Sequence, residues 1–185
     1  MDGAPPDTAA PPPRRLNLHA FARAGRGLQG DIGLDALPRL AASLHGDARE
    51  LRSLRVQWEL LGRVDLEPGG QAVERVRLRV AGMLPLLCQR CLQGVLQRVD
   101  DSATLRLVDE EPSLDAEELE SEEESFCARQ PVDVLELIED QLILALPLVP
   151  MHALCPQPLP ASTGKLPEQD EPSPFAVLAR LRRPD

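Results

Sequence analysis

Aromatic side chains are scarce in this sequence, whose 185 residues include one Trp, three Phe and no Tyr. RNA-binding modules that stack bases on exposed rings need several such side chains, so a module of that kind is not expected. The hydrophobic fraction of 43% predicts instead a core of Leu, Val, Ile and Ala. Such a core is sufficient for one domain of ordinary size.

Long apolar runs are also lacking. No stretch reaches the roughly 18 residues that cross a bilayer, and the start, Met1-Asp2-Gly3-Ala4, has neither the basic nor the apolar region of a secretory signal. We therefore expect a cytoplasmic protein without a membrane partner, in which the four cysteines are reduced. A closely spaced cysteine pair then indicates a metal or redox site more than a disulfide.

Motifs of common enzymes are missing as well, since the sequence has no P-loop, Rossmann glycine pattern, GxSxG or HExxH. It contains only three histidines. Glu136, Glu139 and Asp140 are expected at the solvent edge and cap of a helix. The dense carboxylates fall in a segment expected to be mobile, which cannot hold a well-positioned acid–base pair. The chain is therefore expected not to be an enzyme.

The net charge of -10 comes from one segment. Residues 109–124, here called the acidic segment, contain ten of the 30 acidic residues and no basic ones, so the other 20 balance the 20 basic residues. Like charges repel, and little in this segment can be buried, so it is predicted to be a loop. Overall charge gives no case for non-specific nucleic-acid binding, which needs a positive surface.

Composition divides the chain into four parts. Residues 1–13 are rich in Pro and Ala and predict a disordered tail. A globular pattern covers 14–155 and includes the acidic segment, and a proline-rich linker follows over 156–173. Residues 174–182 begin with Pro after a Ser, which predicts a short capped C-terminal helix.

Three segments, 54–60, 75–80 and 95–107, alternate apolar with polar residues. This period of two is typical of a half-buried antiparallel sheet. Pro68-Gly69-Gly70 marks a turn between the first two segments, and the short connections favour a meander.

Two further helices are expected. Residues 36–44 have one apolar face, with Asp35 as the candidate N-cap. Residues 134–146 follow Asp133 and are apolar around most of the circumference, which predicts burial against the sheet. Together the elements predict an α+β fold: an antiparallel sheet that could close into a barrel-like form, a buried long helix and two shorter helices, 36–44 and 174–182.

The sharpest local motif is a CxxC pair between two predicted strands, followed by Gly94. Two thiolates on a tight turn can share a tetrahedral metal, and glycine relieves crowding after the turn. An HxxC pair about 60 residues later could complete a Cys3His zinc site. The residues are Cys88, Cys91, His152 and Cys155. Two unrelated pairs remain the alternative, and a redox role is less favoured because such motifs usually begin a helix.

The alternation also places arginines on the polar face of the predicted sheet. They are Arg55, Arg75, Arg77, Arg79, Arg98 and Arg106. Guanidinium groups arranged in this way could hold phosphates through paired hydrogen bonds. The alternative is a solvated face, partly neutralised by Glu59 and Asp100. A further hypothesis is that the acidic segment folds over this face and competes with RNA.

Three blocks carry a resemblance to a known family: Cys88–Cys91, residues 133–152 and residues 174–181. Their order and spacing resemble the signature blocks of the YceD family, the large ribosomal RNA subunit accumulation proteins. Residues 28–40 also resemble the amino-terminal block of the family, so the resemblance covers most of residues 15–182.

The resemblance implies a ribosome-biogenesis factor. Members of the family are linked to synthesis, processing or stability of 23S ribosomal RNA, and their genes commonly lie beside one for a large-subunit ribosomal protein. The implied partner is therefore large-subunit ribosomal RNA or a large-subunit ribosomal protein. Alternatives are a metal-dependent ribonuclease or RNA-processing enzyme, and an acidic, chaperone-like binder of a basic ribosomal protein. Some relatives have a second CxxC where this chain has His152 and Cys155.

Overall fold

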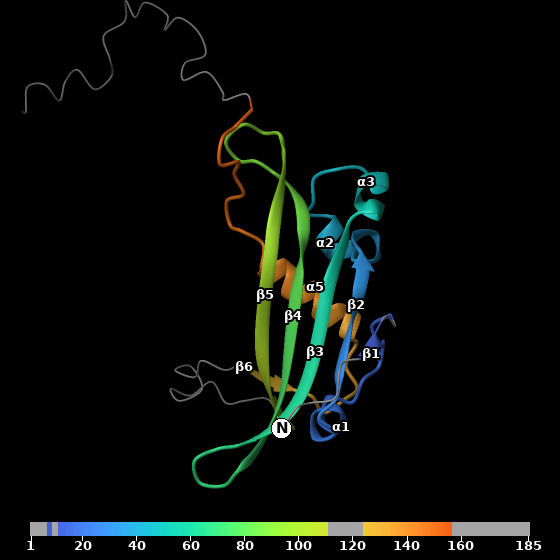
Figure 1. Cartoon of the computed structure of the whole chain (residues 1–185), viewed down its shortest axis with the longest axis vertical. Coiled ribbons are helices and arrows are strands. Elements are labelled where there is room, and N and C mark those ends of the chain that lie inside the picture. The colour runs from blue at the N-terminus through green and yellow to red at the C-terminus, as the bar shows by residue number, and fades with distance from the viewer. Residues whose placement is uncertain (1–6, 9–10, 111–123, 157–185) are drawn as a thin grey trace, which may run out of the picture.

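The computed structural model describes residues 7–8, 11–110 and 124–156, and its main feature is a twisted six-stranded sheet (Figure 1). The strands are β1 (Asp7–Thr8), β2 (Gly27–Gly33), β3 (Arg55–Leu66), β4 (Ala72–Leu87), β5 (Gly94–Val108) and β6 (Glu124–Cys127), in that spatial order. Strands β2 to β5 are antiparallel, whereas β1 and β6 add to the edges in parallel. Since the two edge strands do not pair with each other, the described sheet is open and the barrel-like alternative is wrong.

The predicted meander is formed by β3, β4 and β5. The turn after β3 contains Gly69 and Gly70, whose φ angles of 112° and 82° favour glycine. Strands β4 and β5 extend beyond the segments predicted for them, 75–80 and 95–107. Gly82 is the last residue of β4 that pairs with β3, and the β4–β5 hairpin continues beyond it. The end of the hairpin therefore projects as two strands.

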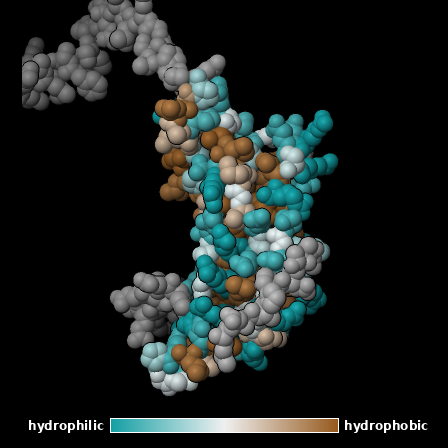
Figure 2. Space-filling model, in the orientation of Figure 1, coloured by the Kyte–Doolittle hydropathy of each residue, from teal (hydrophilic) through white to brown (hydrophobic). Residues whose placement is uncertain are grey.

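One face of the sheet is apolar. Val56, Leu60, Val76 and Val80 on this face are fully buried, as expected where alternate side chains point into a core. Helix α5 (Val134–Leu144) crosses behind this face, while the opposite face is largely hydrophilic (Figures 1 and 2).

Helix α5 buries one side and not most of its circumference. Val134, Ile138 and Leu142 are fully buried, whereas Leu144 is 76% exposed. The expected all-round burial is wrong because only the side of the helix that faces the sheet and α2 is covered.

The remaining helices come from the N-terminal part of the chain. They are α1 (Leu18–Arg23), the 3₁₀ turn η1 (Leu34–Ala36), α2 (Pro38–Ala41) and α3 (Ala48–Ser53). Helix α1 packs closely on β3, where a Cβ atom on Gly62 would lie 2.8 Å from Ala22 Cα and from Phe21 Cδ1. Helix α3 begins with a capping box of Asp47 and Glu50. No helix in the described part of the chain has the length and apolarity to cross a membrane.

The predicted helix 36–44 is shorter than expected. It begins at Pro38, and its N-cap residue Leu37 provides no side-chain cap, so Asp35 does not have the expected role. The cap comes instead from α5. Glu139 is 4% exposed and accepts hydrogen bonds from Arg39 N at 2.7 Å and from Leu40 N at 3.1 Å. Its expected position at the solvent edge is therefore wrong, because it satisfies free donors of another helix.

Several expectations fall outside the described residues. These are the helix 174–182, the linker from residue 157 onward, most of the tail and most of the acidic segment. At the end of that segment, Glu124 begins β6 and is not part of a loop.

Candidate metal centre and polar sheet face

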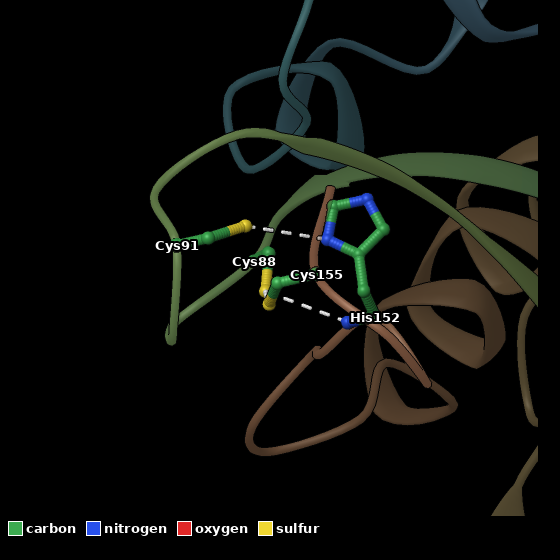
Figure 3. Close-up of side chains that lie close together, drawn as sticks. All are labelled: Cys88, Cys91, His152 and Cys155. Carbon is green, nitrogen blue, oxygen red and sulfur yellow. Dashed lines mark hydrogen bonds between the residues drawn. The ribbon is translucent and has the colours of Figure 1, made fainter. Parts of the chain in front are cut away.

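The structure brings both cysteine-containing motifs to one place. The ligand atoms of four side chains all lie within 4.8 Å of one another, and we call this group the Cys3His cluster (Figure 3). Its members are Cys88, Cys91, His152 and Cys155. The two separations that define it best are 3.9 Å between the sulfurs of Cys88 and Cys155, and 3.4 Å between Cys91 Sγ and His152 Nδ1.

The first half of the cluster is held by a tight turn after β4. Cys88 N donates to Gln93 O at 2.8 Å, and Leu92 N donates to Cys88 O at 2.9 Å. Leu92 has a φ of 58°, which is uncommon for a residue that is not glycine. Gly94 lies against His45, where a Cβ atom would come within 2.9 Å of His45 Cδ2. A side chain at this position would therefore meet His45, which lies in the loop between α2 and α3.

The second half follows α5 and is tied to the turn by hydrogen bonds. Gln89 N donates to Pro150 O at 2.9 Å, and Arg90 Nη2 donates to His152 O at 2.9 Å. Two further donors point at sulfur: Arg90 Nε to Cys155 Sγ at 3.0 Å, and His152 N to Cys88 Sγ at 3.4 Å. Donors of this kind stabilise thiolates and orient metal ligands.

The thiols of the Cys3His cluster differ in pKa. Burial works to raise the pKa of Cys88, but backbone hydrogen bonds from His152, Cys91 and Arg90 outweigh it and lower that pKa to about 5. Burial and the neighbouring thiols raise the pKa of Cys91. One thiolate is therefore available at neutral pH, whereas Cys91 needs a cation beside it to lose its proton.

The donor set fits a tetrahedral metal ion. Bond lengths of about 2.1 to 2.3 Å to nitrogen and sulfur place neighbouring ligands about 3.4 to 3.8 Å apart in a tetrahedron. The observed 3.4 and 3.9 Å separations are close to this range. The Cys3His cluster could therefore bind a metal such as zinc.

The polar face of the sheet carries the six predicted arginines. Strand register places Arg75 between Arg63 on β3 and Arg106 on β5, which forms a row of three arginines across the sheet. Arg77 and Arg79 follow along β4 on the same face. Arg55 and Arg98 lie farther along the same face at the other end. Sequence reasoning missed Arg63, although the alternation of β3 continued to it.

Carboxylates neutralise much of this face. Both nitrogen contacts from Arg79 to Asp100 measure 2.9 Å, and this arginine lowers the pKa of Asp100. Arg98 lies 3.6 Å from the same carboxylate, and Arg55 lies 3.3 Å from Asp31. These arginines are already engaged, as the alternative of a solvated, partly neutralised face anticipated.

The arginines of the row and Arg77 differ in whether they have a carboxylate partner. Arg75 is largely buried and contacts Asp65 at 3.4 Å and Glu67 at 2.6 Å. Arg77 and Arg106 form no ion pair with any carboxylate that the structure describes, and Arg77 has a hydrogen bond of 3.4 Å to Ser102. Arg63 also pairs with Asp65, at 2.7 Å, so the arginines of this region without a carboxylate partner among the described residues are Arg77 and Arg106.

A shallow hollow of about 340 Å³ occupies the other part of this face. Its lining includes Gln29, Asp31, Gln57, Glu59, Arg79 and Ala81. Its titratable side chains are Asp31, Glu59 and Arg79, and no histidine, cysteine or serine is among the residues that line it.

Comparison with known proteins decides the family. Residues 76–182, more than half of the chain, match the family model "Large ribosomal RNA subunit accumulation protein YceD". The chain belongs to the YceD family. It is 37% identical over 103 residues to the Haemophilus influenzae protein of that name, and the match covers 53% of this chain and 59% of the relative. No solved structure matches the chain.

The YceD match contains the Cys3His cluster, most of β4, and all of β5 and α5. The first half of the chain, with α1 to α3 and β2 and β3, lies before it. The name of the family describes a factor for ribosomal RNA accumulation and not an enzyme.

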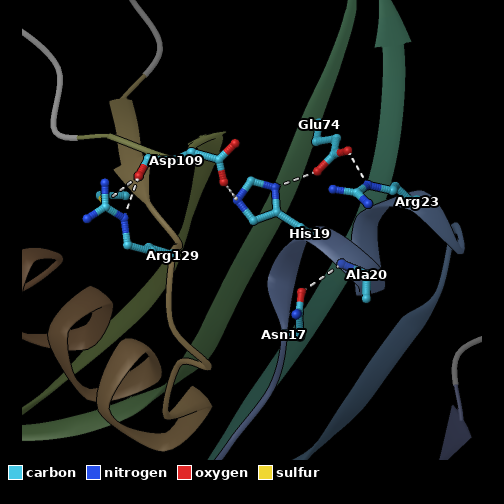
Figure 4. A network of polar contacts seen from close by, with 8 residues as sticks. Asn17, His19, Ala20, Arg23, Glu74, Asp109 and Arg129 are labelled. Carbon is cyan, nitrogen blue, oxygen red and sulfur yellow. Dashed lines mark hydrogen bonds and ion pairs between the residues drawn. The ribbon is translucent and has the colours of Figure 1, made fainter.

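One polar network joins the matched part to the preceding part, and sequence reasoning missed it (Figure 4). His19 of α1 contacts Glu74 at 2.6 Å through Nδ1 and Asp109 at 3.5 Å through Nε2. Glu74 also pairs with Arg23, and Arg129 Nε donates to Asp109 O at 3.1 Å. The network fixes α1 to β4 and to the end of β5, where the acidic segment begins.

Proposed function

We propose that this chain supports the accumulation of large-subunit ribosomal RNA in the cytoplasm as a binding factor, without catalysis, and that it contacts RNA through Arg63, Arg77 and Arg106. The observation that carries the proposal is the concentration of guanidinium groups on one face of the sheet, two of which, Arg77 and Arg106, have no carboxylate partner among the described residues. Guanidinium groups bind phosphate oxygens through two parallel hydrogen bonds.

The spacing of the row suits a nucleic-acid backbone. Neighbouring strands lie about 4.8 Å apart, so Arg63 and Arg106 are separated by roughly 10 Å. Long arginine side chains can reach neighbouring phosphates from these positions. Contacts of this kind give affinity with little sequence preference, and they need no aromatic platform.

We further propose that the Cys3His cluster holds one structural zinc ion. Four protein ligands leave no open position for a substrate, which supports a structural and not a catalytic role. When bound, zinc supplies a positive charge that stabilises thiolates. Arg90 then contributes by donating to Cys155 Sγ and to His152 O, which keeps the segment after α5 against the hairpin end.

The RNA proposal is tested with the double variant Arg77→Glu/Arg106→Glu. Its matched control is Arg49→Glu/Arg52→Glu, which changes two exposed arginines of α3 by the same charge. Binding to 23S ribosomal RNA fragments is measured by fluorescence anisotropy across a salt series. Removing one phosphate contact reduces the salt slope by roughly 0.7 to 0.9, so we expect a lower slope and weaker binding for the first variant only.

Crosslinking in growing cells gives the second measurement. Recovery of large-subunit ribosomal RNA with the wild type and its loss with Arg77→Glu/Arg106→Glu support the proposal. Unchanged RNA recovery with that variant would overturn it. Recovery of a basic ribosomal protein that is lost when residues 109–124 are deleted would support the acidic, chaperone-like alternative. Cleavage of precursor RNA by the purified protein would support the enzymatic alternative.

The zinc proposal is tested by metal analysis of the purified protein. One zinc per chain is expected for the wild type and for Cys127→Ser, since Cys127 is exposed and outside the cluster. Cys88→Ser and Cys155→Ser are expected to lose the metal. Equal metal content in all four proteins would refute the assignment.

A further inference from the structure

Exposed apolar side chains gather around the Cys3His cluster, and this surface goes beyond the RNA-binding role proposed above. Seven of the ten large hydrophobic residues found exposed in the described chain lie at this end of the molecule, and we call them the tip patch. They are Met83, Leu92, Leu96, Leu148, Val149, Met151 and Leu154. Leu148 is 100% exposed and Leu154 is 89% exposed. Figure 2 shows apolar residues clustered at this end, above the hydrophilic middle of the sheet.

Two segments distant in sequence build the patch. Met83 and Leu96 lie on the same face of the β4–β5 hairpin. Pro85 pairs with Leu96 and Met83 pairs with Arg98, and residues two apart on a strand share a face. The segment after α5 is fastened beside the hairpin end by Gln89 N to Pro150 O and by the Cys3His cluster. The segment after α5 is therefore held beside the hairpin end, and exposed apolar side chains gathered at one end of a molecule mark docking sites.

The chemistry of the patch selects an apolar occupant. Between residues 82 and 97 the only charged side chain is Arg90, and residues 146–156 contain no Asp, Glu, Lys or Arg. Arg90 is already engaged by Cys155 Sγ and His152 O. The patch is thus mainly apolar, and a further exposed cation at its edge is Arg98, which pairs with Met83 in the sheet and lies 3.6 Å from Asp100.

We propose that the tip patch is the docking site for residues 174–182 of the same chain. The described chain leaves the patch at Pro156, and 17 residues, 157–173, separate it from that segment. A connection of this length with coil statistics spans about 23 Å, and it gives an effective concentration in the millimolar range. The family match extends to residue 182, so the patch and the segment belong to the same matched region.

The sequence of the segment fits an apolar groove or face. Phe175, Leu178 and Leu181 recur at intervals of three, so on a helix they share one side. The segment contains no acidic residue before the end of the match at residue 182. Docking would cover Phe175 and the patch together, and it would link the end of the matched region to the Cys3His cluster.

The test uses the full-length, metal-loaded protein with a photoreactive residue, Phe175→p-benzoylphenylalanine. Irradiation is followed by mass spectrometry of crosslinked peptides. We expect crosslinks within one chain to residues 83–96 or 148–154, at a yield that is unchanged by tenfold dilution. The matched control, Thr163→p-benzoylphenylalanine, places the same group in the connecting stretch and should give a several-fold lower yield.

Two patch variants make the result specific. Leu96→Glu and Leu154→Glu alter exposed side chains, so both should fold, as judged by Trp58 fluorescence, and each should reduce the crosslink several-fold. Three results would overturn the proposal: a dilution-sensitive crosslink to a second chain, a crosslink to the groove lined by Phe126 and Leu144, or a yield equal to that of the Thr163 control. RNA binding by the arginine row is measured separately, so failure here leaves that proposal intact.

Discussion

The buried carboxylate of Glu139 is the most informative single position for stability. It reaches from α5 to the start of α2, where it accepts hydrogen bonds from Arg39 N and from the fully buried Leu40 N, and it also pairs with Arg39 Nε at 2.9 Å. Glu139→Ala leaves two donors without an acceptor. A buried, unsatisfied donor costs about 1 to 3 kcal/mol. Because Arg39 is half exposed and water can reach its amide, we expect a total loss of about 2 to 4 kcal/mol.

Two comparisons isolate the cause. Glu139→Gln keeps one oxygen for the two backbone donors but loses the charge and the oxygen that accepts from the half-exposed Arg39 Nε, so it should cost about 1 kcal/mol. The control is Asp140→Asn, which removes an exposed contact between Asp140 and Arg39 and should cost about 0 to 1 kcal/mol. Urea unfolding followed by the fluorescence of Trp58, which is 3% exposed, gives the free energy of unfolding. With a slope of about 2 kcal/mol per molar urea, Glu139→Ala should lower the midpoint by about 1 to 2 M. If Glu139→Ala shifted the urea midpoint no more than Asp140→Asn does, the hydrogen bonds from the start of α2 to Glu139 would contribute nothing to stability.

Three further predictions concern the core, the pH response and the metal. Gly62→Ala should lower the free energy of unfolding by about 1 to 3 kcal/mol, because its Cβ atom would overlap α1; an unchanged urea midpoint would contradict this contact. Burial acts to raise the pKa of Glu74, but hydrogen bonds from Arg23 and His19 lower it below the ordinary 4.5. Its contribution is therefore complete above pH 4.5 and is lost as the pH falls through the lowered value, so the stability gap between wild type and Glu74→Gln should narrow below pH 4.5. Chelation should lower the melting temperature, added zinc should restore it, and Cys127→Ser should respond like the wild type.

The sequence predicted best where a pattern was long and local. The alternation of 54–60, 75–80 and 95–107 identified β3, β4 and β5 and the face of each, because a period of two leaves only one register with the apolar side inward. Strands β1, β2 and β6 were missed. All three are short, β1 lies in the segment predicted as a disordered tail, β2 is rich in glycine, and β6 pairs in parallel with a strand that ends 16 residues earlier.

The helices were predicted less well. Helices α1 and α3 were missed, although each begins with a local side-chain cap, Asn17 and Asp47, and a distant residue decides where α2 begins. Helix α2 is capped by Glu139, 100 residues later in the chain, so no local signal gives its first residue. The length of α5 was nearly correct, but its apolar pattern did not show that only one side would be covered. Of the candidate site, the four cluster residues could be paired from motif spacing alone. The neutralisation of Arg55, Arg79 and Arg98 depended on cross-strand partners that only the register reveals.

The Cys3His cluster has a consequence for how the chain tolerates change in length. It joins residues 61 positions apart, Cys91 and His152, and the loop so closed contains the whole acidic segment. Closing a loop of this size in the unfolded chain costs about 4 kcal/mol of entropy. The pairing of β5 with β6 closes a shorter connection inside it, residues 109–123, in which ten extra residues add only about 0.5 kcal/mol. Insertions or deletions among residues 111–123 should therefore leave the Cys3His cluster at the end of the β4–β5 hairpin intact. Evolution can lengthen or shorten that stretch almost without thermodynamic penalty.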